Sequence, residues 1–412
     1  MRKINDRSPL MNTGDTIELS IDRMSFGPAA VGRIQPPGET RAMVIFVEGA
    51  APGERVRVKL TKNHKSYWDA ELLEILEPSS ERTQAPCPVF QTCGGCQWQH
   101  LSYPAQVEAK AEILVHQLNR ATRIPSEEIR AKLKIHSAAS PYGYRARLQI
   151  HGDSQGIGFF SAASHSIAHV GRCLVAHPDI QKTWSEFLAN RPLAQLAKAT
   201  GQFKVEWTRT PNGQIKEALN SKHSALGFTQ VNPEQNEVLV QVVAELAIGG
   251  KVLLDLYGGD GNLSNRLAST FEHILSVDSF NDGPHPASLS APLKPGRHFV
   301  REKVEEFLAE RRWQDWGFDG PIVRQGAEAP VDRTSTIDCI VTDPPRDGLR
   351  EAAGLIADLN APRIILVSCD PSTLARDLTA FTASRYRVDA IHLIDMFPQT
   401  YHLETVISLV LN

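Results

Sequence analysis

A repeated pattern of strand, loop and helix in the second half of the chain limits the available folds more than any other feature. Short apolar stretches recur at residues 252–256, 274–277, 337–341, 364–367, 390–394 and 406–411, with helical segments between them. Strands that alternate with helices form a mostly parallel sheet, because each connection must cross back over one face of the sheet. We therefore predict a doubly wound α/β domain over residues 223–412.

The first part of the chain predicts a different architecture. Over residues 13–77, segments such as 16–21 and 55–60 alternate apolar and polar side chains, which is the period of half-buried strands. Glycine–proline pairs separate about five such strands, as in an OB-like barrel. One hairpin mixes lysines with rings, and this mixture suits either nucleic-acid contact or a solvated edge strand: Lys59, Lys62, His64, Lys65, Tyr67 and Trp68.

Residues 78–222 form a third region, which begins with a polar linker and a group of cysteines. Residues 104–120 predict one helix, which is a candidate to pack on the α/β domain. The remainder mixes strands and helices without a clean period, so we predict a central α+β domain.

Length and charge exclude several classes of protein. A chain of 412 residues predicts two or three domains. The formal net charge of −3 means that nucleic-acid binding must come from local patches. Residues 1–16 lack the apolar core of a signal peptide, and no apolar run approaches the ~20 residues that span a bilayer. We expect a cytoplasmic protein that does not contact the membrane, and we expect a monomer.

Three cysteines lie close together in the segment CPVFQTCGGCQWQH, at positions 87, 93 and 96. In a reducing compartment such a group favours a metal or an iron–sulfur cluster. The spacing differs from the paired C-x2-C of most structural zinc sites. Cys173 is the natural fourth ligand, because it is the other cysteine outside the predicted α/β domain. Zinc and a set of unligated thiols remain alternatives.

A glycine-rich loop, DLYGGDGN, follows the strand at 252–256 and precedes a helix. Its glycines allow the backbone to approach a ligand closely. Asp278 stands near the end of the next strand, where an acid accepts ribose hydroxyls. Dinucleotide enzymes and S-adenosylmethionine methyltransferases share this arrangement, and the missing G-x-G-x-x-G weakens the dinucleotide interpretation.

Another strand ends at Asp343, which two prolines follow in TDPPR. The prolines remove backbone donors and stiffen the loop. An Asp or Asn followed by two prolines at this strand end is typical of nucleic-acid or amide methyltransferases. A plain stiff turn is the alternative.

The strand at 364–367 ends at Cys369, a lone thiol, and Glu404 stands just before the last strand. A thiol at a strand end is a candidate nucleophile, although most free cysteines are simply small buried residues. Methylation at carbon 5 of a pyrimidine needs a nucleophile for carbon 6 and a base for the carbon-5 proton. Cys369 and Glu404 are candidates for these two roles. Cys339 lies within a predicted strand, and we assign it to the core.

Together these motifs resemble the RNA 5-methyluridine methyltransferases, in the branch that has a TRAM domain and a [4Fe-4S] cluster. The resemblance covers nearly the whole chain. Residues 13–77 resemble the TRAM barrel, and the other matching segments follow in family order: CGGCQWQHLSYPAQVEAK, SPYGYRARLQI, GFFSAASHSIAHVGRC, GFTQVNPEQNEVLV, DLYGGDGN, TDPPRDGL, SCDPSTLARDL and HLETV.

The resemblance implies a Rossmann-like class I methyltransferase domain and a role for each matching residue. Cys369 is the implied nucleophile and Glu404 the implied base. Phe228 matches an aromatic that stacks near the target base, which is flipped out of the RNA fold. The cluster is implied to be held by Cys87, Cys93, Cys96 and Cys173. Five residues match positions of the S-adenosylmethionine pocket: Gln230, Tyr257, Gly259, Asp278 and Asp343.

The chain departs from the family pattern in two places. Residues 281–296 are rich in Pro, Gly and Ser and predict a loop on the adenine side of the cofactor pocket, and residues 315–336 are also atypical. Neither includes the nucleophile or the base, so we expect an active enzyme.

The combination of cluster and barrel most resembles enzymes that act on 23S rRNA, and the T-loop of tRNA is the alternative substrate. We expect the cluster to have a structural role that shapes the RNA surface. Two further hypotheses are an RNA-binding protein with a silent methyltransferase domain and a methyltransferase for a small molecule or protein.

Overall fold

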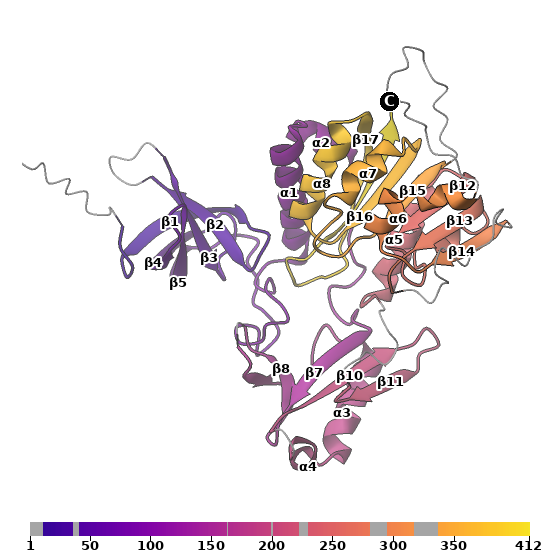
Figure 1. Cartoon of the computed structure of the whole chain (residues 1–412). Helices are drawn as coiled ribbons and strands as arrows, with labels where there is room; N and C mark the ends of the chain where they lie inside the picture. Colours follow the sequence, from indigo (N-terminus) through magenta and orange to yellow (C-terminus); the bar gives the residue numbers. More distant parts are fainter. Residues whose placement is uncertain are drawn as a thin grey trace, which may run out of the picture. The chain divides into compact units, whose positions relative to one another are not determined.

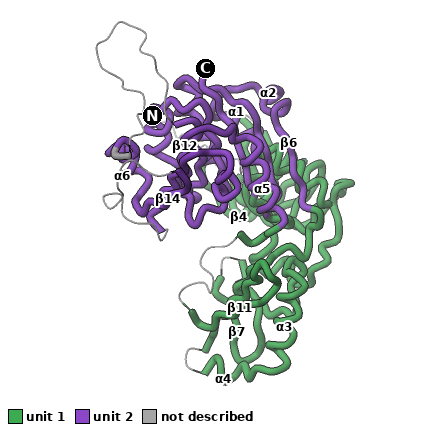
Figure 2. The backbone as a smooth tube through the Cα atoms, turned by 90° about the vertical axis from the view of Figure 1, so that its right-hand side faces the viewer, with its two compact units in different colours: residues 1–113, 139–233, 397–402 green, residues 114–138, 234–396, 403–412 purple. Residues whose placement is uncertain are grey.

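The computed structural model describes residues 11–35, 41–162, 164–198, 201–221, 230–280, 295–316 and 337–412 (Figure 1). By its internal contacts the chain divides into two compact units (Figure 2). The first unit comprises Met1–Ile113, Ala139–Pro233 and Phe397–His402. The second comprises Leu114–Ala138, Glu234–Met396 and Leu403–Asn412.

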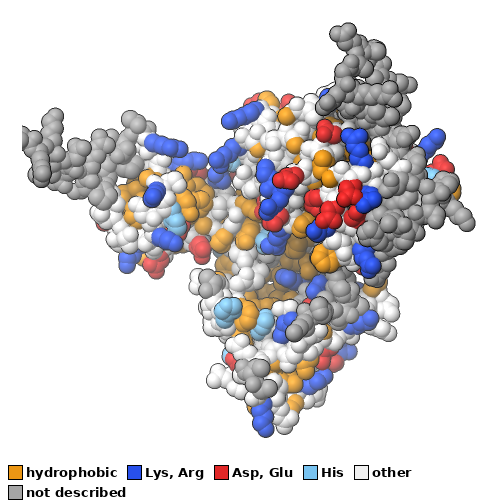
Figure 3. Space-filling view, viewed as in Figure 1, with side chains coloured by type: hydrophobic (Ala, Val, Ile, Leu, Met, Phe, Trp, Pro, Cys, Tyr) orange, Lys and Arg blue, Asp and Glu red, His pale blue; other side chains and the backbone are white. Residues whose placement is uncertain are grey.

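The N-terminal part of the first unit is a closed barrel with strand order β1-β2-β3-β5-β4, which confirms the predicted OB-like barrel. Its strands are β1 (Thr16–Met24), β2 (Ala29–Ile34), β3 (Met43–Glu48), β4 (Arg55–Asn63) and β5 (Tyr67–Glu77). Alternation sets the inward face, since Val56, Val58 and Leu60 are buried while their neighbours on β4 are not. On the face of the barrel that Figure 3 shows, Lys and Arg side chains are scattered among hydrophobic and uncharged surface.

The same unit contains a second sheet with the order β11-β10-β7-β8-β9. Its strands are β7 (Arg147–Gly152), β8 (Ile157–Phe160), β9 (Ile167–His169), β10 (Phe203–Arg209) and β11 (Ile215–Leu219). Two helices, α3 (Pro178–Asn190) and α4 (Leu193–Ala197), accompany this sheet. Sheet and helices form an α+β body, as the sequence predicts for this region.

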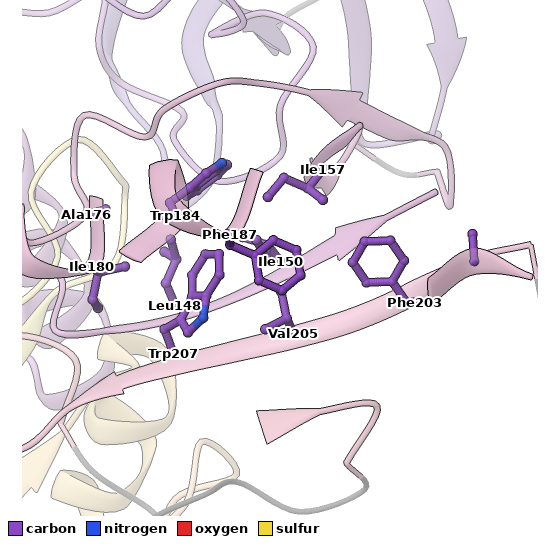
Figure 4. Packing of buried hydrophobic residues seen from close by; sticks show 11 residues of the cluster. Leu148, Ile150, Ile157, Ala176, Ile180, Trp184, Phe187, Phe203, Val205 and Trp207 are labelled. Carbon is purple, nitrogen blue, oxygen red and sulfur yellow. The ribbon is translucent and has the colours of Figure 1, made fainter. Parts of the chain in front are cut away.

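One face of this sheet packs on α3 (Figure 4). Trp184 and Phe187 of the helix meet Trp207 of β10, and all three side chains are at least 96% buried. Their rings lie 5.4–5.9 Å apart between centroids. His177 and Pro178 begin α3, since the His177 ring accepts a hydrogen bond from the N–H of Asp179.

The second unit is built on an eight-stranded sheet with the order β14-β13-β12-β15-β16-β18-β17-β6. Its strands are β6 (Leu133–His136), β12 (Gly250–Leu256), β13 (Phe271–Val277), β14 (Gly296–Val300), β15 (Cys339–Thr342), β16 (Arg363–Ser368), β17 (Tyr386–Ile394) and β18 (Glu404–Leu411). The order runs outward from β12 in both directions, so the sheet is doubly wound as predicted. The central strands are buried on both faces, which explains their continuous apolar sequences.

Helical segments connect and cover these strands. They are α2 (Ser126–Lys132), α5 (Pro233–Leu246), α6 (Val304–Ala309), α7 (Ala352–Asp358) and α8 (Pro371–Thr382), with short 3-10 turns at Ser264–Leu267 and Arg312–Trp316. Figure 1 shows α6, α7 and α8 beside one another. Asp370 caps α8, because its carboxylate accepts the N–H groups of Ser372 and Thr373 at 2.8 and 3.0 Å.

Helix α1 (Tyr103–Thr122) is the helix predicted over 104–120, and the division between the two units falls within it. The edge strand β6 comes from the region that the sequence suggests to be the central domain. Within the described residues, no helix combines the length and apolarity needed to cross a membrane.

Candidate active site

The predicted catalytic and cofactor-binding residues of the second unit lie at one edge of the eight-stranded sheet. Strands β12, β13, β15 and β16 are parallel, so their carboxyl ends lie at the same edge. Tyr257, Asp278 and Asp343 each follow one of these strands directly, and Cys369 follows β16. Strand β18 runs antiparallel to β16, and its first residue, Glu404, therefore stands at this edge too.

The register between β16 and β18 places Cys369 next to Glu404. Ser368 pairs with Thr405, and in an antiparallel ladder the following residue of one strand faces the preceding residue of the other. The charge of Glu404 also acts on the thiol, which requires the two groups to be close. The sequence separates these residues by 35 positions, and the sheet brings them together.

Burial and charge favour the neutral forms of both groups. Burial raises the pKa of Cys369 to about 11, with a smaller contribution from Glu404, while the Arg346 guanidinium lowers it. Glu404 is 5% exposed. Burial raises the pKa of its carboxyl group well above the usual value, and the nearby Asp343 raises it further. The reactive form of cysteine is the thiolate, and these effects disfavour it.

The glycine-rich loop after β12 has a backbone conformation that is strained for most residues other than glycine. Tyr257, Gly259 and Gly261 have φ values of +58°, +51° and +81°. A side chain at Gly258 would collide with the carboxylate of Asp255 and the hydroxyl of Ser276. The loop therefore lies directly against the sheet at Gly258.

One carboxylate binds the backbone of this loop, and a second is buried beside it. Asp278 accepts a hydrogen bond from the N–H of Gly259 at 3.1 Å. Asp255 is 1% exposed and accepts hydrogen bonds from the hydroxyls of Ser264 and Ser276, the latter at 2.9 Å. Burial raises the pKa of the Asp255 carboxyl. We did not single out Asp255 or Arg346 from the sequence, although both lie within the quoted motifs.

Two predicted residues are not among the described residues of the second unit. Phe228 lies outside the described residues, as do positions 281–294 and 317–336 of the two atypical segments. Gln230 is described as a half-buried residue of the first unit. The assignments of Gln230 and Phe228 therefore stay predictions from the family resemblance.

The four predicted ligand cysteines all lie in the first unit. All are half-buried free thiols. Burial raises the pKa of Cys96 to about 12, and Cys173, Cys93 and Cys87 each raise it further, so all three thiols lie within electrostatic reach of Cys96. Within the described parts of the chain, no group of three or more His, Cys, Asp or Glu side chains has the geometry to hold a metal ion. The donor set fits an iron–sulfur cluster chemically, and the cluster itself stays a prediction.

A backbone bridge and two glutamine side chains hold the cysteine loops. Cys93 forms an isolated bridge with Ser161, beside the end of β8. The side chain of Gln99, which is 2% exposed, accepts the N–H of Cys87 at 3.3 Å and also bonds the thiol of Cys96. Gln181 accepts the N–H of Cys173 at 2.9 Å. We did not identify either glutamine from the sequence, because no local pattern marks a distant hydrogen bond.

Comparison with known proteins identifies the same two parts of the chain. Residues 11–73 match the TRAM domain, and residues 331–411 match the family described as tRNA (Uracil-5-)-methyltransferase. The chain is 30% identical over 415 residues to an uncharacterized RNA methyltransferase of Bdellovibrio bacteriovorus, covering 98% of this chain and 96% of that protein. It is also 30% identical over 423 residues to the 23S rRNA (uracil(1939)-C(5))-methyltransferase RlmD of Alkalilimnicola ehrlichii, covering 88% and 90%.

A solved structure shares the fold along nearly the whole chain. It is the Pyrococcus abyssi tRNA (uracil-54, C5)-methyltransferase in complex with S-adenosyl-L-homocysteine, with a TM-score of 0.62 and 21% identity over 96% of this chain and all of that one. Identity at this level supports the fold and not the substrate. With the sequence relatives, it shows that the chain belongs to the family of S-adenosylmethionine-dependent RNA uracil-5 methyltransferases and carries a TRAM domain.

Proposed function

We propose that this protein methylates carbon 5 of a uridine in 23S rRNA. The observation that carries the proposal is the pairing of Cys369 with Glu404 at the sheet edge that also holds the glycine-rich loop. A nucleophile, a base and a cofactor loop at one edge are what carbon-5 methylation of uracil requires. The similarity to a relative named as a 23S rRNA methyltransferase supports this choice of RNA.

In the proposed reaction, the thiolate of Cys369 adds to carbon 6 of the uracil. The resulting enolate attacks the methyl group of S-adenosylmethionine through carbon 5, and S-adenosylhomocysteine leaves. Glu404 then removes the proton from carbon 5, the double bond between carbons 5 and 6 re-forms, and the thiolate departs. The positive charge of Arg346 opposes the effects that keep the thiol neutral, so it would favour the first step.

The cofactor would lie over the glycine-rich loop. Asp278 stands where a carboxylate accepts ribose hydroxyls, and Tyr257, Gly259 and Asp343 stand at the same edge. Gln230 would complete the pocket and Phe228 would stack near the target base. The target uridine must leave its RNA stack to reach Cys369, as in other enzymes that act on a base.

The four cysteines would hold a [4Fe-4S] cluster with a structural role, in which thiolates from two chain segments tie the central region together. Each cysteine of such a cluster binds a different iron, so the thiols need not converge on a single ion as they do around zinc. Quantification of iron, acid-labile sulfide and zinc in anaerobically purified protein distinguishes the two. Turnover that changed severalfold on oxidation or reduction of an intact cluster would contradict a structural role.

The barrel over residues 13–77 would bind RNA, the region 78–222 would carry the cluster, and residues 223–412 would carry the reaction. The outer face of the barrel offers lysines beside rings, and His64 stacks on Tyr67 with centroids 4.4 Å apart. We expect the protein to act in the cytoplasm as a monomer.

A nucleoside map of 5-methyluridine tests the function. Ribosomal RNA and tRNA are compared between cells with the gene and cells in which it is deleted. Loss of one 23S site is the expected result. Loss at the tRNA T-loop would keep the reaction and overturn the choice of RNA, and no change in either RNA would favour a silent RNA-binding protein.

A further inference from the structure

Helix α8 carries a buried carboxylate, Asp377, that takes no part in the chemistry proposed above. Its side chain is 5% exposed. It lies about two helical turns after Asp370, the residue that caps this helix. Burial of a carboxylate costs free energy unless its oxygens accept hydrogen bonds. The hydrogen-bond partners of Asp377 therefore indicate its role.

Its backbone partners belong to a single loop, residues 344–350, which follows β15. One carboxylate oxygen, Oδ2, accepts the N–H of Leu349 at 2.6 Å, and the other, Oδ1, accepts the N–H of Arg350 at 3.3 Å. The neighbouring Arg376 donates to Asp377 at 2.7 Å and to the carbonyl oxygen of Asp347 at 2.8 Å. Two adjacent side chains of α8 therefore bind three residues of the loop.

The loop is shaped to receive this carboxylate. Gly348 has a φ of +74°, and its N–H donates to the carbonyl oxygen of Pro345 at 2.8 Å, which closes a tight turn. A side chain at Gly348 would collide with the Asp377 carboxylate and the Arg376 guanidinium. Arg350 also has a positive φ, +52°, a backbone conformation that persists only where its surroundings hold it.

The loop and the helix both begin beside the reacting groups. The loop starts directly after Asp343 and contains Arg346, whose charge acts on the thiol of Cys369. Helix α8 starts two residues after Cys369, at Pro371. The contact between Asp377 and the loop therefore links the segment that carries the nucleophile to the segment that carries the cation.

We propose that Asp377, supported by Arg376, is a positioning residue for methyl transfer. It holds the 344–350 loop against α8 so that Arg346 and Asp343 keep their places beside Cys369. The inference rests on the proposed function and deepens it, because it assigns the geometry of the addition step to a residue that does not touch the substrate.

The test uses the full-length protein and substrate RNA that contains 5-fluorouridine. Cys369 forms its bond to carbon 6 and carbon 5 receives the methyl group, but fluorine replaces the proton that Glu404 would remove. The covalent adduct therefore accumulates and reports addition and methyl transfer alone. Asp377→Asn should lower the rate of adduct formation about tenfold or more, while the affinity for S-adenosylmethionine stays close to that of the wild type. Alkylation of Cys369 by iodoacetamide should require a higher pH.

Two further variants disrupt the same contact, one in the loop and one at the neighbouring residue of α8. Gly348→Ala should reproduce the slow adduct formation from the loop. Arg376→Ala removes a half-exposed side chain, should leave the fold intact and should give a smaller loss in the same direction. Asp389→Asn is the matched control, because Asp389 pairs at 3.0 Å with Arg363, the first residue of β16 and thus far along the strand from Cys369.

An Asp377→Asn protein that loses thermal stability but forms adduct at the wild-type rate would overturn the inference and leave the proposed function intact. An equal loss of rate in Asp389→Asn would also overturn it, because the effect would then come from destabilisation. A wild-type protein that forms no adduct with ribosomal RNA or tRNA would overturn the proposed function and this inference with it.

Discussion

The edge of the eight-stranded sheet and the cysteine loops of the first unit are two candidate sites built in opposite ways. At the sheet edge, each reacting residue directly follows or begins a strand, and the ladder between β16 and β18 sets Cys369 against Glu404. The cysteines instead stand on loops, where an isolated bridge at Cys93 and the amides of Gln99 and Gln181 hold them. The register of a long ladder positions the first site, whereas one isolated backbone bridge and two glutamine side chains position the second.

This difference predicts how each site responds to loss of its ligand. A sheet that is buried on both faces keeps its register without a cofactor, because the ladder and the core are independent of it. Loops outside a continuous ladder open more easily, so their arrangement depends more on whatever joins them. The sheet edge should therefore be formed in advance, whereas the cysteine loops should tighten only when the proposed cluster is bound.

The largest expected effect is that of Cys369→Ala. Removal of the nucleophile should lower methyl transfer about 10⁴-fold or more, while binding of S-adenosylmethionine and the iron content stay unchanged. Single-turnover assays, calorimetry and iron quantification check the three parts. Loss of iron in this variant would contradict the independence of the two sites.

Glu404→Gln should slow turnover about 10²–10⁴-fold, because the base for the carbon-5 proton is lost. Addition and methyl transfer precede this step, so the variant should accumulate a covalent adduct with RNA through Cys369. A denaturing gel should show a slower-migrating band that disappears in the double variant with Cys369→Ala. Slow turnover without such a band would count against Glu404 as the base.

Cys96→Ser should act on the other site. We expect loss of the cluster iron, a lower melting temperature and about tenfold weaker RNA binding, while S-adenosylmethionine binds as in the wild type. Cys339→Ser, which changes a buried cysteine of the sheet, is the control and should retain iron. If Cys96→Ser abolished cofactor binding, the two sites would not be independent.

The smallest expected effect concerns stability and pH. The folded protein raises the pKa of Glu404 above its ordinary value of 4.5, so above that pH the folded state binds more protons than the unfolded state. The free energy of unfolding therefore falls as pH rises from about 4.5 toward the raised pKa, with a slope of at most about 1.4 kcal/mol per pH unit from this group.

Glu404→Gln removes this contribution, since glutamine does not ionise. The stability of the variant relative to the wild type should increase with pH across this window, as measured by denaturant unfolding. A constant difference between the two proteins at all pH values would show that Glu404 ionises normally. The same carboxyl must be ionised to act as a base, so methylation by the wild type should rise with pH.

Much of the fold could be predicted from local pattern. The strands of the α/β sheet are buried on both faces and read as apolar runs, and the barrel strands alternate because one face meets the core. The nucleophile, the base and the acid after β13 could be proposed because strand ends are where such sheets bind ligands. The four cysteines could be named together, although their cluster stays a prediction.

Other features had no local signal. Strand β6 has the sequence LKIH and is half-exposed, so its place beside β17 follows from backbone pairing alone. The position of β18 between β16 and β17 could not be predicted from the sequence either, since an apolar strand has the same composition whichever neighbours it pairs with. Asp377 and Gln99 resemble ordinary surface residues until their distant partners are known.

Local pattern was enough to predict the central strands of the α/β sheet, the buried face of the barrel strands and the residue types that could carry the reaction, because periodicity records burial at short range. Only the tertiary structure decided that Glu404 stands opposite Cys369, that Arg346 acts on the thiol, and that Asp377 holds the loop between them. These contacts join residues far apart in the chain. Strand register and packing set them, and neither produces a periodic pattern in the sequence.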